Sequence, residues 1–68
     1  MANSLMAKCI FAAEMEDAVK KPENRNDDGS INWDFVDADV YPTMSIWFPG
    51  EEYVTTFDEL ADKIEETL

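Results

Sequence analysis

The chain has 68 residues and carries 16 acidic against 5 basic side chains, a formal net charge of −11 without any histidine. A chain this short forms one domain, here residues 1–68, and buries only about 60% of the surface that its unfolded form exposes. Its charge would repel nucleic acid and anionic membranes, so we expect it to bind neither directly. A content of 46% hydrophobic and 12% aromatic residues can build a core and argues against disorder.

Cysteine usage bears on the compartment. The chain contains a single cysteine, Cys9, so it cannot form an internal disulfide. A lone cysteine in an apolar segment is typical of a small buried side chain in a protein from a reducing compartment. The apolar stretch around it is interrupted by Lys8 and is too short to cross a bilayer. We therefore expect a cytoplasmic protein.

Residues 4–21 show apolar side chains at helical spacing, and we predict a helix there. The predicted apolar stripe includes Leu5, Cys9, Ala12 and Val19. Pro22 has no N–H and would clash with the preceding turn, so the helix should end before it. A strand over residues 6–12 is the alternative.

The next segment alternates in the manner of a strand. Ile31, Trp33 and Phe35 are separated by polar residues, a pattern typical of a half-buried strand. The apolar phase then shifts, and its members become Val36, Ala38 and Val40. A strand cannot keep one buried face across such a shift, so we predict a bulge or break between Phe35 and Val36. In this strand Asp37 and Asp39 would share one face.

The last third of the chain predicts a hairpin and then a helix. In residues 43–57, Pro49 and Gly50 fit the centre of a type II turn between two strands. Thr56 and Glu59 have the spacing of a capping box at a helix start. The buried face of this helix would hold Phe57, Leu60, Ala61, Ile64 and Leu68. The fold expected is thus α+β: a small single domain of order α-β-β-β-α, with a short antiparallel sheet packed by an N-terminal and a C-terminal helix.

The stretch "NRNDDGSINWDF", residues 24–35, resembles the calcium loop of the EF-hand family. The resemblance implies a calcium site whose first three ligands are Asn24, Asn26 and Asp28. The twelfth position should be a bidentate glutamate, but it is Phe35, which has no oxygen to offer. We therefore favour a polar turn with a positive φ at Gly29, and keep a degenerate single calcium site as the weaker alternative. No cofactor is expected.

Nothing in the sequence indicates catalysis. Histidine, the commonest general base, is absent, and two glycines cannot make a glycine-rich phosphate loop, so we expect no enzyme activity. Aromatic side chains among carboxylates are instead typical of a surface that binds a basic protein. The predicted partner-binding residues are Asp34, Asp37, Asp39, Trp47, Glu51, Glu52, Tyr53, Asp58 and Asp62.

The favoured interpretation is a small acidic inhibitor of the kind found in phage. It would mimic nucleic acid and block the basic site of a DNA- or RNA-binding protein. The alternative is an acidic adaptor or complex subunit that binds through an aromatic patch around Trp47 or Tyr53. We expect a monomer or a weak homodimer, because like charges oppose close self-association.

Overall fold

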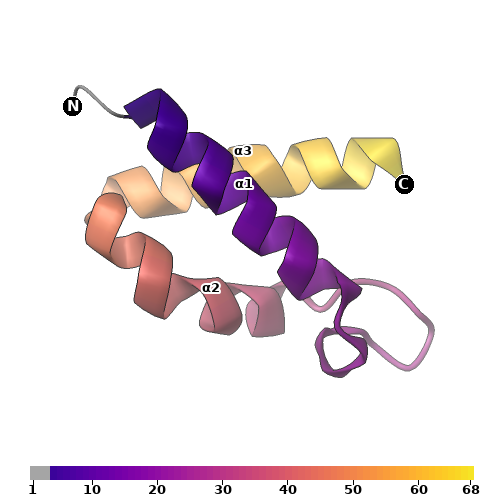
Figure 1. Cartoon of the computed structure of the whole chain (residues 1–68). Helices are drawn as coiled ribbons and strands as arrows, with labels where there is room; N and C mark the ends of the chain where they lie inside the picture. Colours follow the sequence, from indigo (N-terminus) through magenta and orange to yellow (C-terminus); the bar gives the residue numbers. More distant parts are fainter. Residues whose placement is uncertain (1–3) are drawn as a thin grey trace.

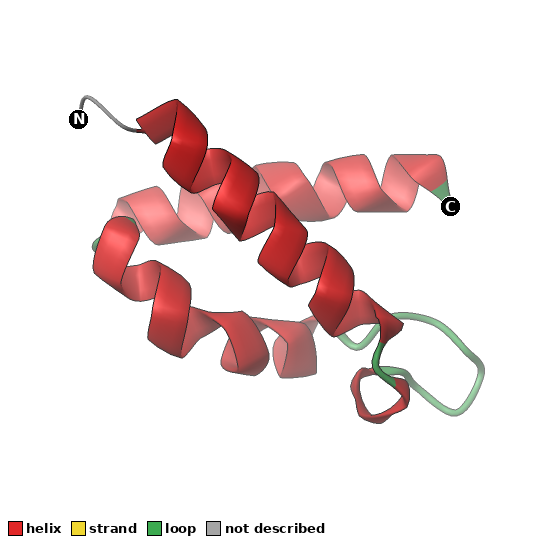
Figure 2. Cartoon of the chain, viewed as in Figure 1, coloured by secondary structure: helices red, strands yellow, loops and turns green. Residues whose placement is uncertain are grey.

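The computed structural model describes residues 4–68, which form three α-helices and a short 3-10 turn (Figure 1). In chain order the elements are α1 (Ser4–Lys20), η1 (Pro22–Asn24), α2 (Trp33–Trp47) and α3 (Glu51–Thr67). The described part of the chain contains no strand, and its one isolated bridge joins Arg25 to Ile31 (Figure 2). The predicted α+β fold with an antiparallel sheet is therefore wrong.

The first predicted helix is confirmed as α1, which ends at Lys20, just before Pro22. Its buried residues are Ala7, Phe11, Met15, Ala18 and Val19. Cys9 lies about 160° around the helix axis from Phe11, and it is exposed. The expectation of a buried cysteine is wrong because the apolar stripe is centred elsewhere on the helix.

The end of α1 is capped by side chains from the segment that follows it. Asn24 Nδ2 donates to the Ala18 carbonyl oxygen at 2.9 Å, and Arg25 Nε donates to that of Val19 at 2.7 Å. The last carbonyls of a helix lack their usual helical donors. Arg25 supplies a donor to the Val19 carbonyl, and Asn24 adds a second bond to the Ala18 carbonyl, which also accepts from Lys21 N at 3.2 Å. Asn24 is buried, with 5% of its surface exposed, and water cannot easily replace it.

The helix α2 takes the place of the first predicted strand. Asn32 caps it, since the Asn32 side chain accepts a hydrogen bond from the Phe35 backbone N–H at 3.2 Å. Val36, Val40 and Met44 are buried, and their spacing of four residues lines one face of a helix. The change in the apolar pattern at Phe35 and Val36 is explained by the periodicity of a helix. The predicted bulge or break in a strand is therefore wrong.

Pro42 lies inside α2 and is exposed. Proline has no N–H, so the Ala38 carbonyl lacks its usual helical partner, and an interior proline costs a helix about 3 kcal/mol. The side chains of Val40 and Met44 point to the opposite, buried side of the helix. Their burial offsets the cost, and tertiary packing thereby overrides local preference.

Pro49 and Gly50 join α2 to α3 instead of two strands, and the ψ of Gly50 does not fit the predicted type II turn. Gly50 has φ 61° and ψ −130°, a combination that residues with a Cβ avoid. The predicted hairpin over residues 43–57 is therefore wrong. Thr56 does not cap a helix, because α3 already begins at Glu51 and Thr56 is buried within it.

The prediction of a C-terminal helix is confirmed. Of the residues predicted for its buried face, Phe57 belongs to the core, and three others pack against the core. These three partly buried residues are Leu60, Ala61 and Ile64. Leu68 follows the helix and is exposed.

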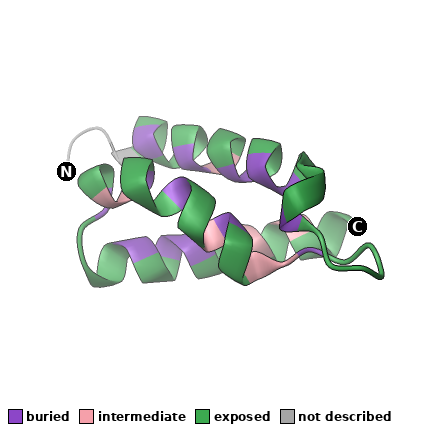
Figure 3. Ribbon diagram, turned by 90° about the horizontal axis from the view of Figure 1, so that it is seen from below, coloured by how far each residue is buried: buried purple, intermediate pink, exposed green. Residues whose placement is uncertain are grey.

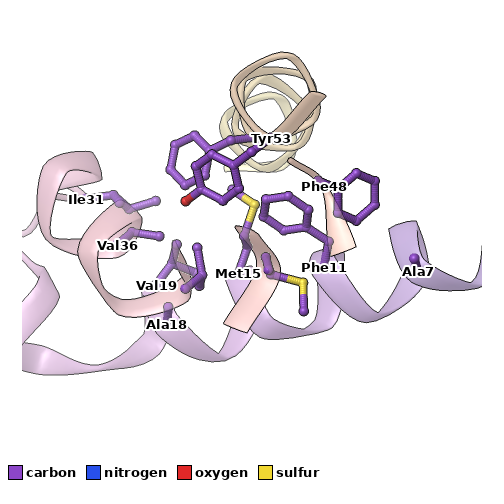
Figure 4. Packing of buried hydrophobic residues seen from close by; sticks show 12 residues of the cluster. Ala7, Phe11, Met15, Ala18, Val19, Ile31, Val36, Phe48 and Tyr53 are labelled. Carbon is purple, nitrogen blue, oxygen red and sulfur yellow. The ribbon is translucent and has the colours of Figure 1, made fainter. Parts of the chain in front are cut away.

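Phe11 lies at the centre of the core (Figure 4). It is fully buried, and its ring centroid lies 5.2 Å from that of Phe48, 5.3 Å from Tyr53 and 6.4 Å from Phe57. Aromatic pairs at such distances each contribute about 0.5–1.5 kcal/mol beyond the area they bury. One side chain of α1 thus holds the end of α2 and the first half of α3 together.

The helices are arranged so that three of their ends meet. Figure 1 shows the start of α1, the end of α2 and the start of α3 at one end of the molecule. The loop that follows η1 lies at the opposite end of an elongated body measuring 40 × 23 × 17 Å.

Candidate protein-binding surfaces

The outer face of α3 carries a row of carboxylates. Asp58, Asp62 and Glu66 follow one another at four-residue spacing and lie on the side of the helix opposite Tyr53 and Phe57. The three acids are exposed, whereas the two aromatic residues are buried. Figure 3 shows this division along the ribbon, with exposed positions facing outward and buried ones facing the other helices. We call Asp58, Asp62 and Glu66 the outer acidic row.

The helix α3 also holds most of the charge of the protein. Its residues 51–67 include seven acids and one base, Lys63, which gives −6 of the total of −11. Within residues 4–68, the one ion pair that involves α3 joins Lys8 Nζ to Glu59 Oε1 at 3.4 Å. Like charges four residues apart destabilise an isolated helix by about 0.2–0.5 kcal/mol per pair. The outer acidic row therefore does not stabilise the helix.

The acids of α2 are placed differently. Asp37 and Asp39 lie about 200° apart around a helix, so the expectation that they share a face is wrong. Asp37 Oδ1 accepts a hydrogen bond from the Tyr53 hydroxyl of α3. Asp39 Oδ2 accepts bonds from Lys21 Nζ at 3.0 Å and Asn24 Nδ2 at 3.1 Å. The two carboxylates thus connect α2 to different neighbours.

Asp39 is part of the capping arrangement at the end of α1. The hydrogen bond from Lys21, and secondly that from Asn24, hold the pKa of the Asp39 carboxyl below its ordinary value. The same contact with Asp39 raises the pKa of Lys21. Because its carboxylate already has two donors, Asp39 has less to offer a binding partner than the acids of the outer acidic row.

Tyr53 was predicted to contact a partner, but the structure places it in the core with 5% of its surface exposed. Burial, and secondly the hydrogen bond to Asp37, raise the pKa of its hydroxyl well above the ordinary value. The hydroxyl therefore stays protonated and donates a hydrogen bond to Asp37. Tyr41 packs edge-on against the ring, with centroids 5.0 Å apart.

Asp34 lies in the first turn of α2 and is exposed. A carboxylate in this position interacts favourably with the positive end of the helix dipole. The neighbouring Trp33 is partly buried, and its Nε1 donates to Glu65 Oε2 of α3 at 2.8 Å. This bond holds α2 against α3 and leaves Asp34 at the surface.

A groove of about 630 Å³ opens where the three helix ends meet. Ala7, Phe48 and Thr56 are buried beneath it, whereas Leu5 and Trp47 are 76% and 50% exposed. The other residues that line it are Lys8, Glu51, Glu52, Thr55 and Glu59. We call this site the Trp47 groove. It combines apolar side chains with carboxylates at its border.

The three residues of the predicted calcium loop are all engaged in hydrogen bonds within the fold, Asn24 with the end of α1 and the other two with Ser30. Asn24 bonds to the end of α1, and Asn26 Nδ2 donates to Ser30 Oγ at 2.8 Å. Asp28 Oδ1 accepts from Ser30 N at 3.0 Å and from Ser30 Oγ at 2.6 Å, and these bonds lower its pKa. Gly29 has φ 91°, so the predicted polar turn is confirmed. No group of three or more histidine, cysteine or acidic side chains in the described part of the chain could hold a metal.

Comparison with known protein families, with curated proteins and with solved structures finds no match for this chain. None of the helices within residues 4–68 has the length and apolar character needed to cross a membrane. We therefore infer the function from the outer acidic row and the Trp47 groove. Of the predicted partner-binding residues, the structure leaves these exposed with no side-chain hydrogen bond among the described residues: Asp34, Trp47, Glu51, Glu52, Asp58 and Asp62.

Two surface residues were missed in the sequence. Glu66 continues the four-residue spacing of Asp58 and Asp62, and this spacing was available as a signal. Leu5 was assigned to the buried stripe of the first helix, but it is exposed at the Trp47 groove. Only the tertiary arrangement brings Leu5 near the end of α2, so no local pattern could have placed it.

Proposed function

We propose that the protein is a small acidic, non-enzymatic binding module that inhibits a DNA- or RNA-binding protein by occupying its basic site, in the manner of phage inhibitors. The charge density of α3 carries the proposal. Seven carboxylates lie within residues 51–66, which cover about 22 Å of helix axis. One strand of duplex DNA presents a phosphate every 3.4 Å or so, hence about six or seven over the same length.

The way α3 is held supports this role. Tyr53 and Phe57 fix its inner face in the core, so its carboxylates are displayed on a rigid helix. A preorganised surface loses less conformational entropy on binding than a flexible acidic tail would. Asp58, Asp62 and Glu66 also form no ion pair among the described residues. They are therefore available to lysine and arginine side chains of a partner.

Two further features belong to the proposal. We assign no catalysis, because every group within residues 4–68 whose pKa is shifted is hydrogen-bonded within the fold: Lys21, Asp28, Asp39 and Tyr53. We place the protein in the cytoplasm, where a free thiol such as that of Cys9 stays reduced.

A capture experiment tests the proposal. Tagged protein is used to capture partners from a bacterial lysate, with and without excess duplex DNA. We expect it to capture a nucleic-acid-binding protein that DNA displaces, and we expect this binding to weaken at least about tenfold as salt rises through the physiological range. The triple variant Asp58→Asn/Asp62→Asn/Glu66→Gln should lose the capture.

A matched variant controls for net charge alone. Glu14, Glu16 and Asp17 are exposed acids of α1, and Glu14→Gln/Glu16→Gln/Asp17→Asn removes the same three charges. This variant should keep the captured protein. Capture that DNA does not displace, or equal loss in both triple variants, would contradict nucleic-acid mimicry by α3.

A second candidate function is that of an acidic adaptor or complex subunit. The observation that favours it is the half-exposed Trp47 in a groove with buried apolar residues beneath it. Tyr53, the other predicted aromatic contact, is buried and cannot serve. An adaptor contact of this kind would be mainly apolar, so it would survive high salt and excess DNA.

A further inference from the structure

We infer that the Trp47 groove binds a segment of a partner protein in which a large apolar side chain lies beside lysine or arginine. The inference goes beyond the proposed inhibition, because the groove adds apolar side chains of α1 and α2 and contains no residue of the outer acidic row, although Glu51, Glu52 and Glu59 are among the seven carboxylates of α3. It also gives the adaptor function a specific partner chemistry.

Two large apolar side chains at the groove are exposed to solvent. Trp47 and Leu5 remain 50% and 76% exposed, although buried Phe48 and Ala7 lie beside them. Covering apolar surface stabilises a complex by roughly 25 cal/mol for each Å² removed from water. Tryptophan in particular is enriched among the residues that dominate binding energy at protein interfaces. The volume of about 630 Å³ is large enough to receive apolar side chains of a partner.

The charged residues that border the groove indicate a basic partner. Three glutamates and one lysine border the groove, so its lining carries a net charge of 1 − 3 = −2. Glu59 is paired with Lys8, whereas Glu51 and Glu52 have no ion pair among the described residues. Both lie in the first turn of α3, beside Trp47. Lysine or arginine next to an apolar anchor would find free carboxylates there.

The same charges argue against other occupants. A second copy of the chain would bring another −11 against this border, and an acidic or phosphorylated segment would be repelled in the same way. A purely apolar segment would leave Glu51 and Glu52 without a partner at the edge of the interface. A basic segment with an apolar anchor satisfies both kinds of side chain.

The fluorescence of Trp47 tests the inference directly. Trp33→Phe removes the second indole while keeping a ring beside Phe57, so the emission then reports on the groove alone. The probe is a short amidated peptide of leucine and lysine with the pattern of an amphipathic helix. We expect a blue shift of the emission and protection of Trp47 from acrylamide as the peptide binds.

Matched peptides and variants identify what is recognised. Replacing the leucines by serine, or the lysines by glutamate, should weaken binding at least about tenfold. The variants Leu5→Ser and Glu51→Gln/Glu52→Gln should weaken it as well. Asp58→Asn/Asp62→Asn should leave it unchanged, because these acids lie on the outer face of α3.

Four results would overturn the inference. The serine peptide could bind as well as the leucine peptide, which would show attraction by charge alone. Asp58→Asn/Asp62→Asn could abolish binding, which would place the peptide on the outer acidic row. Sedimentation equilibrium could show a dimer that Trp47→Gln dissociates, which would assign the groove to a second copy. Failure of the peptide to bind, with DNA-displaced capture intact, would reject the groove and leave the proposed inhibition standing.

Discussion

The acids of α2 and the acids of α3 have the same chemistry but different surroundings. Asp37 accepts a hydrogen bond from α3, and Asp39 accepts two from the segment that follows α1, so both help to hold the helices in place. Asp58 and Asp62 project from the outer face of α3 and have no such bonds. The acids that give the net charge of −11 therefore fall into two groups. Some carboxylates form hydrogen bonds within the fold, and others are free to contact a partner.

The largest effect on stability is expected at Asn24, which bonds to Asp39 of α2 and to the end of α1. Asn24→Ala removes one of the two donors to the Ala18 carbonyl and one of the two donors to Asp39, at a buried position. We expect it to lower the free energy of unfolding by about 2 kcal/mol, since two hydrogen bonds, one of them to a charged carboxylate, are lost together. Asn26→Ala is the control, because Asn26 is exposed and its side chain bonds only to Ser30. Urea denaturation should separate the two variants clearly. Equal losses would contradict a special role for the capping bonds.

The contact between Tyr53 and Asp37 comes next in size. Tyr53→Phe keeps the ring packed against Phe11 but removes the hydroxyl that bonds to Asp37. We expect a loss of about 1 kcal/mol in the free energy of unfolding. Tyr41→Phe is the matched control, because that ring is half exposed and its hydroxyl has no hydrogen bond among the described residues. An effect of Tyr41→Phe as large as that of Tyr53→Phe would show that the bond to Asp37 contributes nothing.

The elements that could be predicted are those in which local signals agree with packing. The helix α1 has both helical spacing and a stop at Pro22, and α3 has an apolar face that recurs at helical spacing from Phe57 onward. The helix α2 could not be predicted in the same way. Its residues include a strand-like alternation, from Ile31 to Phe35, and an interior Pro42. Burial of its other face against α1 and α3 decides in favour of the helix.

The surfaces could be predicted only where they depend on one helix. The exposed side of α3, with Asp58 and Asp62, follows from helical spacing alone. The environments of Asp37 and Asp39 required the correct secondary structure, because a strand places them together and a helix places them apart. The Trp47 groove required the tertiary arrangement as well, since three separate helix ends line it.

A smaller effect concerns acid stability. The pKa of Asp39 is lowered in the folded state, so its contribution to stability is present above the unfolded value of about 3.9. It is lost as the pH falls through the lower, folded value. The stability difference between the native chain and Asp39→Asn should therefore shrink as the pH is lowered below about 4.

Lys21→Gln provides the control for this prediction. Lys21 is the largest cause of the lowered pKa of Asp39, so its removal should reduce the same acid dependence. Unfolding would be followed by circular dichroism across the acid range. A constant difference between the native chain and Asp39→Asn at every pH would show that the carboxylate gains nothing from its two donors.

The smallest effect has the opposite sign. Asp62 lies four residues from both Asp58 and Glu66, so Asp62→Asn relieves two repulsive pairs on the exposed side of α3. We expect the free energy of unfolding to rise by a few tenths of a kcal/mol at low salt, and the gain should fade as salt screens the charges. Asp39→Asn, measured under the same conditions at neutral pH, should instead destabilise the protein. If Asp62→Asn also proved destabilising, the acids of α3 would be structural like those of α2, and the proposed inhibition would lose the free carboxylates on which it depends.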